Sequence, residues 1–317
     1  MRKSVLLWAS LILFGFASAG LAADYPSRQI TVILPTAPGG SAMISGQILM
    51  EAMKKQLNQV VVISYKPGAL QAVGTELVLK ARPDGYTLGY TYEPDLASKI
   101  LLDGKNLSWG KDDFTHIGLT AFSPFLLWVK SDAPWKTFED LIKYGRENEL
   151  SYGSAGVGAM NHIYVELLGR KTGMKVNHVP YAGSGLVTTA LLGGHINMTL
   201  GVLGRMKQYY DAGSVRPLVS LADERIPEAK DVPTGKEMGF AVRGYNYHHL
   251  WGQKTLPADI TARLATAFEK AVKDPEFKAT LTKAGFEPRF YSPKETKEMW
   301  EGDFKIVEEV ISQWTKK

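Results

Sequence analysis

The stretch that most constrains the fold of this chain is residues 30–43, which read ITVILPTAPGGSAM. Its first five residues are apolar enough for a buried strand, two prolines end that strand, and a glycine pair allows a tight turn. Ser41 is placed to cap a helix that we expect over residues 42–57. Such a strand, turn and helix start aim free backbone N–H groups and the positive end of a helix dipole at one point, which favours an anion. Taken alone, the stretch is explained more simply as an ordinary turn of an α/β domain.

The same arrangement occurs twice more. One predicted strand runs into SAGVGAM at 154–160, which opens a helix through Arg170, and another runs into PYAGSG at 180–185. We also expect strands at 60–64, 86–90, 125–129, 150–153, 175–179, 197–202, 216–220 and 247–253, and helices at 75–81, 138–148, 186–192, 257–273, 275–284 and 293–315. Strands that alternate with helices over short glycine-containing connections indicate parallel sheets covered by helices.

The order of these elements predicts two lobes. At 317 residues, the chain is long enough for two domains. We predict an α/β fold in which residues 24–122 plus 248–317 form one lobe and residues 123–247 are inserted as the second. Two strands, near 125–129 and 249–253, would join the lobes. Glycine-rich turns of both lobes would then face one cleft, which is a common place for a small-molecule site.

The N-terminus has the pattern of a cleaved signal peptide, residues 1–23. Two basic residues precede an apolar run at 5–16, and small residues follow, with possible cleavage after Ala19, Ala22 or Ala23. The apolar run is shorter than the roughly 20 residues that a membrane-spanning helix needs. The chain has no cysteine, which excludes disulfides and a lipoprotein anchor. An exported protein without disulfides suits a bacterial periplasm, where we expect this one.

The sequence lacks the usual motifs of catalysis. We find no G-x-S-x-G, Walker A or G-x-G-x-x-G sequence, and the six histidines have no metal-ligand spacing. We therefore expect no metal and no cofactor. The formal net charge of +5 is mild, and Lys and Arg are not clustered with aromatic residues, so we also expect no nucleic-acid partner. Three anion-favouring helix starts without these motifs indicate binding rather than catalysis.

Several polar side chains are candidates for orienting a ligand: Ser41, Gln71, Ser123, Ser154, His162, Tyr181, Ser184 and Asn197. A purely structural role is the alternative to ligand contact for these side chains. The serines at the three turns would serve as helix caps, His162 would bond a carbonyl or Glu166 one turn on, and Tyr181 would be a core aromatic.

Taken in order, the motifs resemble a known family. The segments LPTAPGGSA, KPGALQAVGT, PDGYTL, SYGSAGVGAMNH, HVPYAGSG, ALLGGHIN and DVPT-x-x-E-x-G are similar to those of the tripartite tricarboxylate transporter solute receptors, or Bug family, from about Tyr25 through Ser292. The resemblance implies a type II periplasmic binding protein fold, with two Rossmann-like lobes and a ligand cleft between them. It also implies a periplasmic receptor that closes on a small organic acid and delivers it to a membrane permease.

The resemblance also implies a site built from four loops, at 38–43, 69–75, 154–158 with His162, and 181–184. Backbone amides, hydroxyls and ordered waters of these loops would hold carboxylate groups. The candidate ligand-binding residues are Pro38, Gly39, Gly40, Ser41, Met43, Ala69, Leu70, Gln71, Thr75, Ser123, Ser154, Ala155, Gly156, Val157, Gly158, His162, Tyr181, Ala182, Gly183, Ser184 and Asn197.

The chain departs from the family pattern at two places. Many members have aspartate at the position of Met43, where it can hold a ligand amine, so we predict a ligand without an amino group. Leu70 and Gln71 replace a glycine pair. Apolar side chains would then form one end of the pocket and favour an aromatic or longer aliphatic acid; these are Met43, Leu70, Val157 and Met160, with Tyr92, Phe122 and Tyr181 nearby.

Two other functions remain open from the sequence. The receptor could present its solute to a membrane signalling protein rather than to a permease. A periplasmic hydrolase that uses Ser154 or Ser184 as its nucleophile is the weaker alternative, because the motifs that accompany such a nucleophile are missing.

Overall fold

A computed structural model of the chain describes residues 25–240 and 242–312. The predicted signal peptide, residues 1–23, lies outside the described residues, as does the predicted end of the last helix at Thr315. Within the described ranges, no helix has both the length and the apolar character needed to cross a bilayer.

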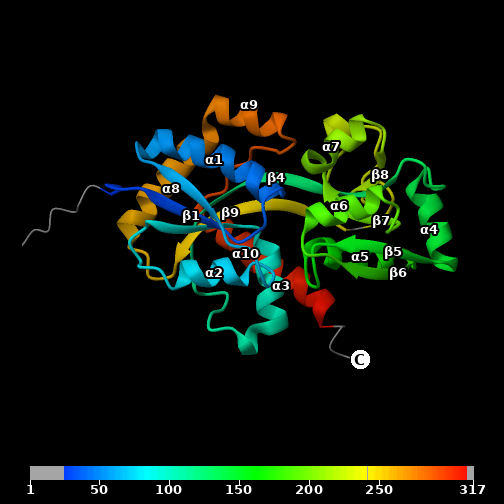
Figure 1. The fold of residues 1–317 in the computed structure, drawn as a ribbon, viewed down its shortest axis with the longest axis horizontal. Helices are drawn as coiled ribbons and strands as arrows, with labels where there is room; N and C mark the ends of the chain where they lie inside the picture. Colours follow the sequence, from blue (N-terminus) through cyan, green and yellow to red (C-terminus); the bar gives the residue numbers. More distant parts are fainter. Residues whose placement is uncertain (1–24, 241, 313–317) are drawn as a thin grey trace, which may run out of the picture.

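The first group of elements, which we call lobe 1, is built on a parallel sheet. Strand β1 (Ile30–Leu34) lies between β2 (Val61–Tyr65) and β3 (Thr87–Thr91), and β3 pairs antiparallel with β9 (Tyr245–Gln253). The helices around it are α1 (Ser41–Leu57), α2 (Ala72–Leu79), α3 (Glu93–Asp103), α8 (Ala258–Lys273), α9 (Pro275–Lys283) and α10 (Pro293–Ile311), with a short 3-10 turn, η1 (Gly104–Asn106) (Figure 1).

The second group, lobe 2, repeats this plan. Strand β5 (Glu149–Ser154) lies parallel between β6 (Lys175–Pro180) and β7 (Met198–Val202). The other members of the lobe are strand β8 (Val215–Ser220), the helices α4 (Phe138–Glu147), α5 (Met160–Thr172), α6 (Ser184–Leu192) and α7 (Leu203–Asp211), and the 3-10 turn η2 (Pro227–Ala229).

Two long strands join the lobes. The first part of β4 (Phe114–Lys130) pairs with β9, and its last residues pair with β7 and β8 instead. The sheet order is therefore β2-β1-β3-β9-β4-β7-β5-β6, with β8 beside β4, and Figure 1 shows β4 and β9 running between the two groups. The predicted two-lobed α/β architecture is confirmed. The predicted lobe limits, at 122/123 and 247/248, fall inside these strands.

The predicted helix caps are wrong at all three glycine-rich turns. The residue before α1 is Gly40, which has the extended backbone that a cap needs, so Ser41 is already helical. Ser154 ends β5, and α5 begins only at Met160. Ser184 is likewise the first residue of α6, and none of these three helix starts has a side-chain cap bond. The hydroxyl groups of Ser41 and Ser154 instead bond residues outside these helix starts.

Two helices were not predicted, α3 and α7. In α3, Pro94 reads as a strand or loop breaker in the sequence, yet it occupies the first turn of the helix, where its missing N–H costs nothing. Helix α7 begins directly where β7 ends at Val202, without a glycine turn or a capping side chain to mark it. Both helices contribute residues to the cleft described below.

The largest apolar cluster draws on both lobes. It includes Leu96 of α3, Ile163 of α5 and Val307 of α10, all fully buried. Helix α10 contacts α3, β4 and α5, so the C-terminal helix packs against both lobes. The lobes are therefore held together by packing as well as by the two connecting strands.

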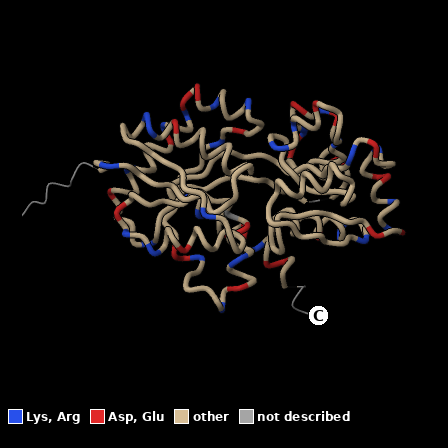
Figure 2. Tube along the Cα trace, viewed as in Figure 1, with Lys and Arg blue, Asp and Glu red and all other residues tan. Residues whose placement is uncertain are grey.

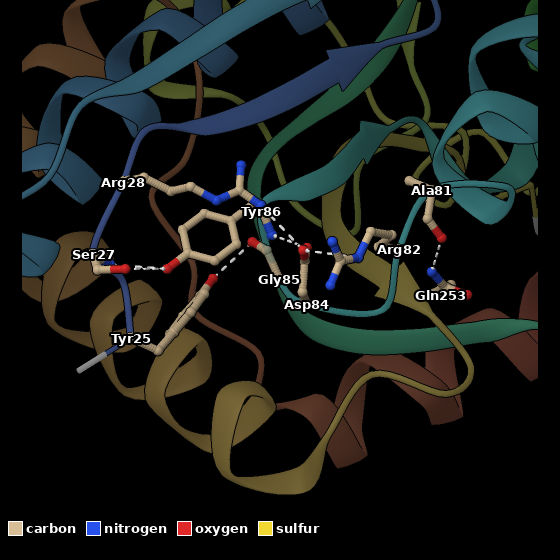
Figure 3. A network of polar contacts seen from close by, with 9 residues as sticks. All are labelled: Tyr25, Ser27, Arg28, Ala81, Arg82, Asp84, Gly85, Tyr86 and Gln253. Carbon is tan, nitrogen blue, oxygen red and sulfur yellow. Dashed lines mark hydrogen bonds and ion pairs between the residues drawn. The ribbon is translucent and has the colours of Figure 1, made fainter. Parts of the chain in front are cut away.

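The start of the described chain is fixed by a polar network at one edge of the sheet (Figure 3). The Tyr25 hydroxyl donates to the Gly85 carbonyl at 2.7 Å, and Arg28 pairs with Asp84 at 3.0 Å while covering the ring of Tyr86. This network precedes β3, at the amino ends of the parallel strands, whereas the cleft lies at their carboxyl ends. It anchors the chain end away from the cleft.

Charged residues of both signs follow one another along the outer helices and loops (Figure 2). Several form exposed i,i+4 pairs on helices, such as Glu76 with Lys80 and Lys207 with Asp211. Such exposed pairs contribute about 0.3–0.5 kcal/mol each. They keep the surface polar and have little influence on the fold.

Candidate ligand-binding cleft

A cavity of about 630 Å³ lies where the carboxyl ends of the parallel strands of the two lobes face each other. Its size is in the range of small-molecule sites. Ten of the predicted site residues line it: Pro38, Gly40, Ser41, Ala69, Leu70, Gln71, Ala155, Ala182, Gly183 and Ser184. Each of the four predicted loops therefore reaches the cavity.

The start of α1 supplies hydrogen-bond donors from lobe 1. The first N–H groups of any helix have no acceptor within it, and at this end of α1 they accompany the hydroxyl of Ser41. The Asn246 amide donates to the Ser41 hydroxyl at 3.2 Å, and the Nε2 atom of His248 lies 3.5 Å from it. This end of the cavity can therefore receive an anion without any lysine or arginine.

The donors and acceptors of the hydrogen bonds around His248 can be assigned one after another. Ser45 donates to the carbonyl of Ser41 at 3.0 Å, so its oxygen accepts from the Nδ1 atom of His248 at 3.2 Å and from the Tyr90 hydroxyl at 3.1 Å. The Nε2 atom of His248 is then an acceptor, which faces the hydroxyl of Ser41. Burial lowers the pKa of His248 to about 3, so the ring is neutral at neutral pH. The Oδ1 atom of Asn246 is buried and has no partner, so it is available to a ligand donor.

The second loop carries an unusual run of backbone conformations. Ala69, Leu70 and Gln71 all have positive φ, at 48°, 50° and 69°. Residues other than glycine rarely adopt this left-handed backbone conformation. The Gln71 amide donates to the Tyr92 carbonyl at 3.0 Å and accepts from its N–H at 3.3 Å. Gln71 therefore lines the cavity, but its polar atoms hold the loop against lobe 1 instead of facing a ligand.

The third loop, residues 154–158, is held in place by hydrogen bonds to His162 and His178. Gly158 donates its N–H to the Nδ1 atom of His162 at 3.0 Å, and the Ser154 hydroxyl lies 2.5 Å from the Nε2 atom of His178. The two imidazole rings stack with centroids 3.8 Å apart. Burial lowers the pKa of both histidines, to about 3 for His162. His162 and Ser154 are among the residues that do not line the cavity, and they shape the loop that does.

This arrangement argues against Ser154 as the nucleophile of a hydrolase. The hydroxyl of Ser154 faces His178 and its own loop, where it donates to the Gly156 carbonyl at 2.9 Å. Ser154 is fully buried and lies outside the cavity lining. A nucleophile needs access to the substrate, which this serine lacks.

Several other predicted residues lie away from the cavity. Thr75 is a buried residue of α2, Ser123 donates to the Gly285 carbonyl at 3.3 Å, and Asn197 bonds Ser151 at the amino end of β7. The predicted residues outside the lining are Gly39, Met43, Thr75, Ser123, Ser154, Gly156, Val157, Gly158, His162, Tyr181 and Asn197. Tyr181 packs against an apolar cluster that includes residues of β4, α6 and α7, in agreement with the simpler role of a core aromatic.

The apolar part of the cavity differs from the predicted one. Leu70 and Met160 line it as expected. Met43 lies against its own turn, with its sulfur 3.3 Å from the N–H of Gly39, and Val157 is 57% exposed. Phe122 stacks on Tyr247 where β4 pairs with β9. Tyr92 lines the cavity as expected, and the remaining apolar lining comes from Phe125 of β4, Leu186 of α6, and Leu200 and Val202 of β7.

The sequence analysis missed the one guanidinium among the described residues of the lining, that of Arg205. This residue is on α7, is half-buried, and has a buried Nε atom without a hydrogen-bond partner. Gly201 lies directly beneath it, since a Cβ there would come within 2.5 Å of its Nη2 atom. Because α7 was not predicted, no local signal placed Arg205 near the turns.

Asp95 was missed for the same reason. This residue is on α3, and its carboxylate accepts the N–H of Met160, the first residue of α5, at 2.9 Å. The bond connects lobe 1 to lobe 2 beside the cavity. Burial raises the pKa of Asp95 to about 7, so the group is only partly ionised at neutral pH.

Among the described residues, no cluster of three or more His, Asp and Glu side chains could hold a metal ion. His248 and His249 are adjacent in β9 and lie on its two faces, as predicted for a strand. His248 reaches Ser45, and His249 reaches His116 with 3.1 Å between ring nitrogens.

Two α/β lobes joined by two strands, with a cavity at their facing loops, define the class of two-lobed periplasmic binding proteins. Comparison with protein families makes this more specific. The family model for the tripartite tricarboxylate transporter family receptor, TctC, matches residues 46–315. The chain belongs to this family, as its motifs indicated, and the family is one of substrate-binding receptors rather than enzymes.

Individual proteins agree with this assignment. A Cupriavidus necator protein, the UPF0065 protein in gbd 5'region, is 31% identical over 294 residues, covering 90% of this chain and 88% of its own. The structure of Rpa4515 from R. palustris with adipate is 26% identical, with a TM-score of 0.85, and covers 91% of this chain and 98% of that one. The structure of MatC from Rhodopseudomonas palustris with bound malate is 25% identical, with a TM-score of 0.81, and covers 90% and 100%.

Proposed function

We propose that this protein is a periplasmic receptor that captures a small organic acid with a partly apolar body and delivers it to a tripartite membrane permease. The observation that carries the proposal is the composition of the cavity. Donors at the start of α1 and the guanidinium of Arg205 stand beside apolar walls that include Phe125 and Leu200. A carboxylate on an aliphatic or aromatic body complements both parts. The similarity to proteins solved with malate and adipate supports a carboxylate ligand.

A ligand without an amino group remains our prediction, on a revised basis. Met43 lies outside the cavity lining, so its replacement of an aspartate has less influence than the sequence indicated. Asp95 is the one Asp or Glu among the described lining residues, and the N–H of Met160 already donates to it. The positive charge of Arg205 further disfavours a ligand ammonium in the same cavity.

Membership of a transporter receptor family supports delivery of the acid to a permease. Deleting the gene in its native host should abolish uptake of the bound acid, and a plasmid copy should restore it. A sensor would behave differently, because its deletion would leave uptake intact and remove only a transcriptional response to the acid.

The ligand class is tested by a thermal-shift screen of the mature protein. The panel should contain dicarboxylates, tricarboxylates, aromatic acids, fatty acids and amino acids. A ligand at about 100 times its dissociation constant adds about 2.7 kcal/mol, which is a shift of a few degrees for a protein of this size. We expect hits among acids with an apolar body. Hits confined to amino acids, or to citrate-like triacids, would contradict the proposal.

A further inference from the structure

Arg205 has no acidic partner in the described structure, and its place in the cavity lining sets it apart from the other described arginines. Several surface arginines are instead paired, such as Arg28 with Asp84, Arg225 with Glu237 and Arg243 with Asp223. Arg205 lines the cavity from α7, and its buried Nε atom makes no hydrogen bond. A cation removed from water without a partner costs free energy, so proteins rarely keep one without a use for it.

The nearest candidate for a partner does not fill the role. Asp95 lines the same cavity, but its pKa is raised, whereas a guanidinium in contact would lower it. The pKa of Arg205 is itself lowered to about 10 by burial, and an adjacent carboxylate would raise it. These opposite shifts indicate that the two groups do not neutralise each other. Arg205 remains a cation at neutral pH, facing a cavity.

We propose that Arg205 binds a carboxylate group of the ligand directly, from lobe 2. This inference rests on the proposed function, since it requires an acidic ligand. A guanidinium offers pairs of parallel N–H donors that can take both oxygens of a carboxylate. The start of α1, with Ser41 and Asn246, lies on the lobe 1 side of the same cavity. An acid held by Arg205 at one end therefore presents its other end to lobe 1.

The two sides of the cavity would then differ in the ligand groups that they accept. The helix start and the hydroxyl of Ser41 are neutral donors, which accept a carboxylate, a carbonyl or a hydroxyl. Arg205 selects a negatively charged ligand group, because a neutral group would remove the guanidinium from water without balancing its positive charge. The acid group is then required on the lobe 2 side, and the chemistry on the lobe 1 side is more permissive.

The test compares wild type with Arg205→Met and with Arg205→Lys in thermal-shift and calorimetric titrations. Malate, adipate and benzoate serve as probes. Arg216→Met is the matched control, because Arg216 also has a buried Nε atom without a partner but is on β8, outside the cavity lining. We expect Arg205→Met to weaken binding of the active probe roughly 10- to 100-fold, Arg205→Lys to weaken it less, and Arg216→Met to leave it unchanged.

A second readout separates a binding role from a structural one. Without ligand, Arg205→Met should melt at or above the temperature of wild type, because it removes an unpaired cation from a partly buried position. If the melting temperature falls and the affinity does not, Arg205 is structural and the inference is wrong. If wild type binds a probe and Arg205→Met binds it equally well, the inference fails while the receptor function stands. If no probe and no acid of the screen binds wild type, the proposed function fails as well.

Discussion

Buried histidines give this protein a specific dependence on pH at the level of single residues. His248 and His249 are fully buried in β9, and His162 is 7% exposed behind the third loop. Burial lowers the pKa of each of the three to about 3, from about 6.5 in an unfolded chain. The folded protein therefore holds them neutral, with ring nitrogens used as acceptors and donors for their neighbours.

We predict that stability falls as the pH drops below about 6.5. In that range the unfolded chain takes up protons on these histidines and the folded protein does not, down to about pH 3. Each such group then removes about 1.4 kcal/mol per pH unit. Melting curves between pH 8 and pH 4 measure the slope. His248→Gln should flatten it, whereas His195→Gln, at an exposed position, should not. An equal slope in His248→Gln would contradict this account.

At the scale of elements, the site depends on how α2 is docked. Gly74 is in this helix, and a Cβ atom there would lie 2.6 Å from the Cβ of Pro35 and 2.9 Å from the carbonyl of Lys66. Glycine thus allows α2 to approach the end of β1. This approach fixes the loop with Leu70 and Gln71 at the cavity, because α2 begins directly after that loop.

We predict that Gly74→Ala destabilises the protein by about 1–3 kcal/mol, because the added methyl group meets backbone that cannot easily move. Gly302→Ala is the control: this glycine is also helical, in α10, and has open space at its Cβ position. It should gain up to about 1 kcal/mol from helix propensity alone. Chemical denaturation measures both changes, and a stabilised Gly74→Ala protein would show that the close approach is unimportant.

The elements also show what the sequence could predict. Strand β1 and the alternation of strands and helices followed directly from apolar runs and glycine turns, which are local signals. The predicted caps were wrong because Gly40, Ala159 and Gly183 occupy the N-cap positions that we expected serines to occupy. Arg205 and Asp95 could not be found, because α3 and α7 have no cap motif and reach the cavity only through the tertiary fold.

In the molecule as a whole, two lobes meet around one cavity, which we propose to hold one acid. Residues of both lobes share the largest apolar cluster, α10 packs against both, and the carboxylate of Asp95 bonds the start of α5 beside the cavity. The lobe 1 side contributes the start of α1, and the lobe 2 side contributes Arg205. A ligand that bonds both sides would add to this packing and stabilise the contact between the lobes.

The most direct test is a calorimetric titration of the mature protein with the most strongly stabilising acid of the screen and with its neutral amide. The account predicts one acid bound per chain, and binding of the amide at least about 100-fold weaker, because the amide leaves the Arg205 guanidinium unpaired. Equal affinity for the acid and the amide would show that the cavity does not recognise a carboxylate, and would contradict the central claim.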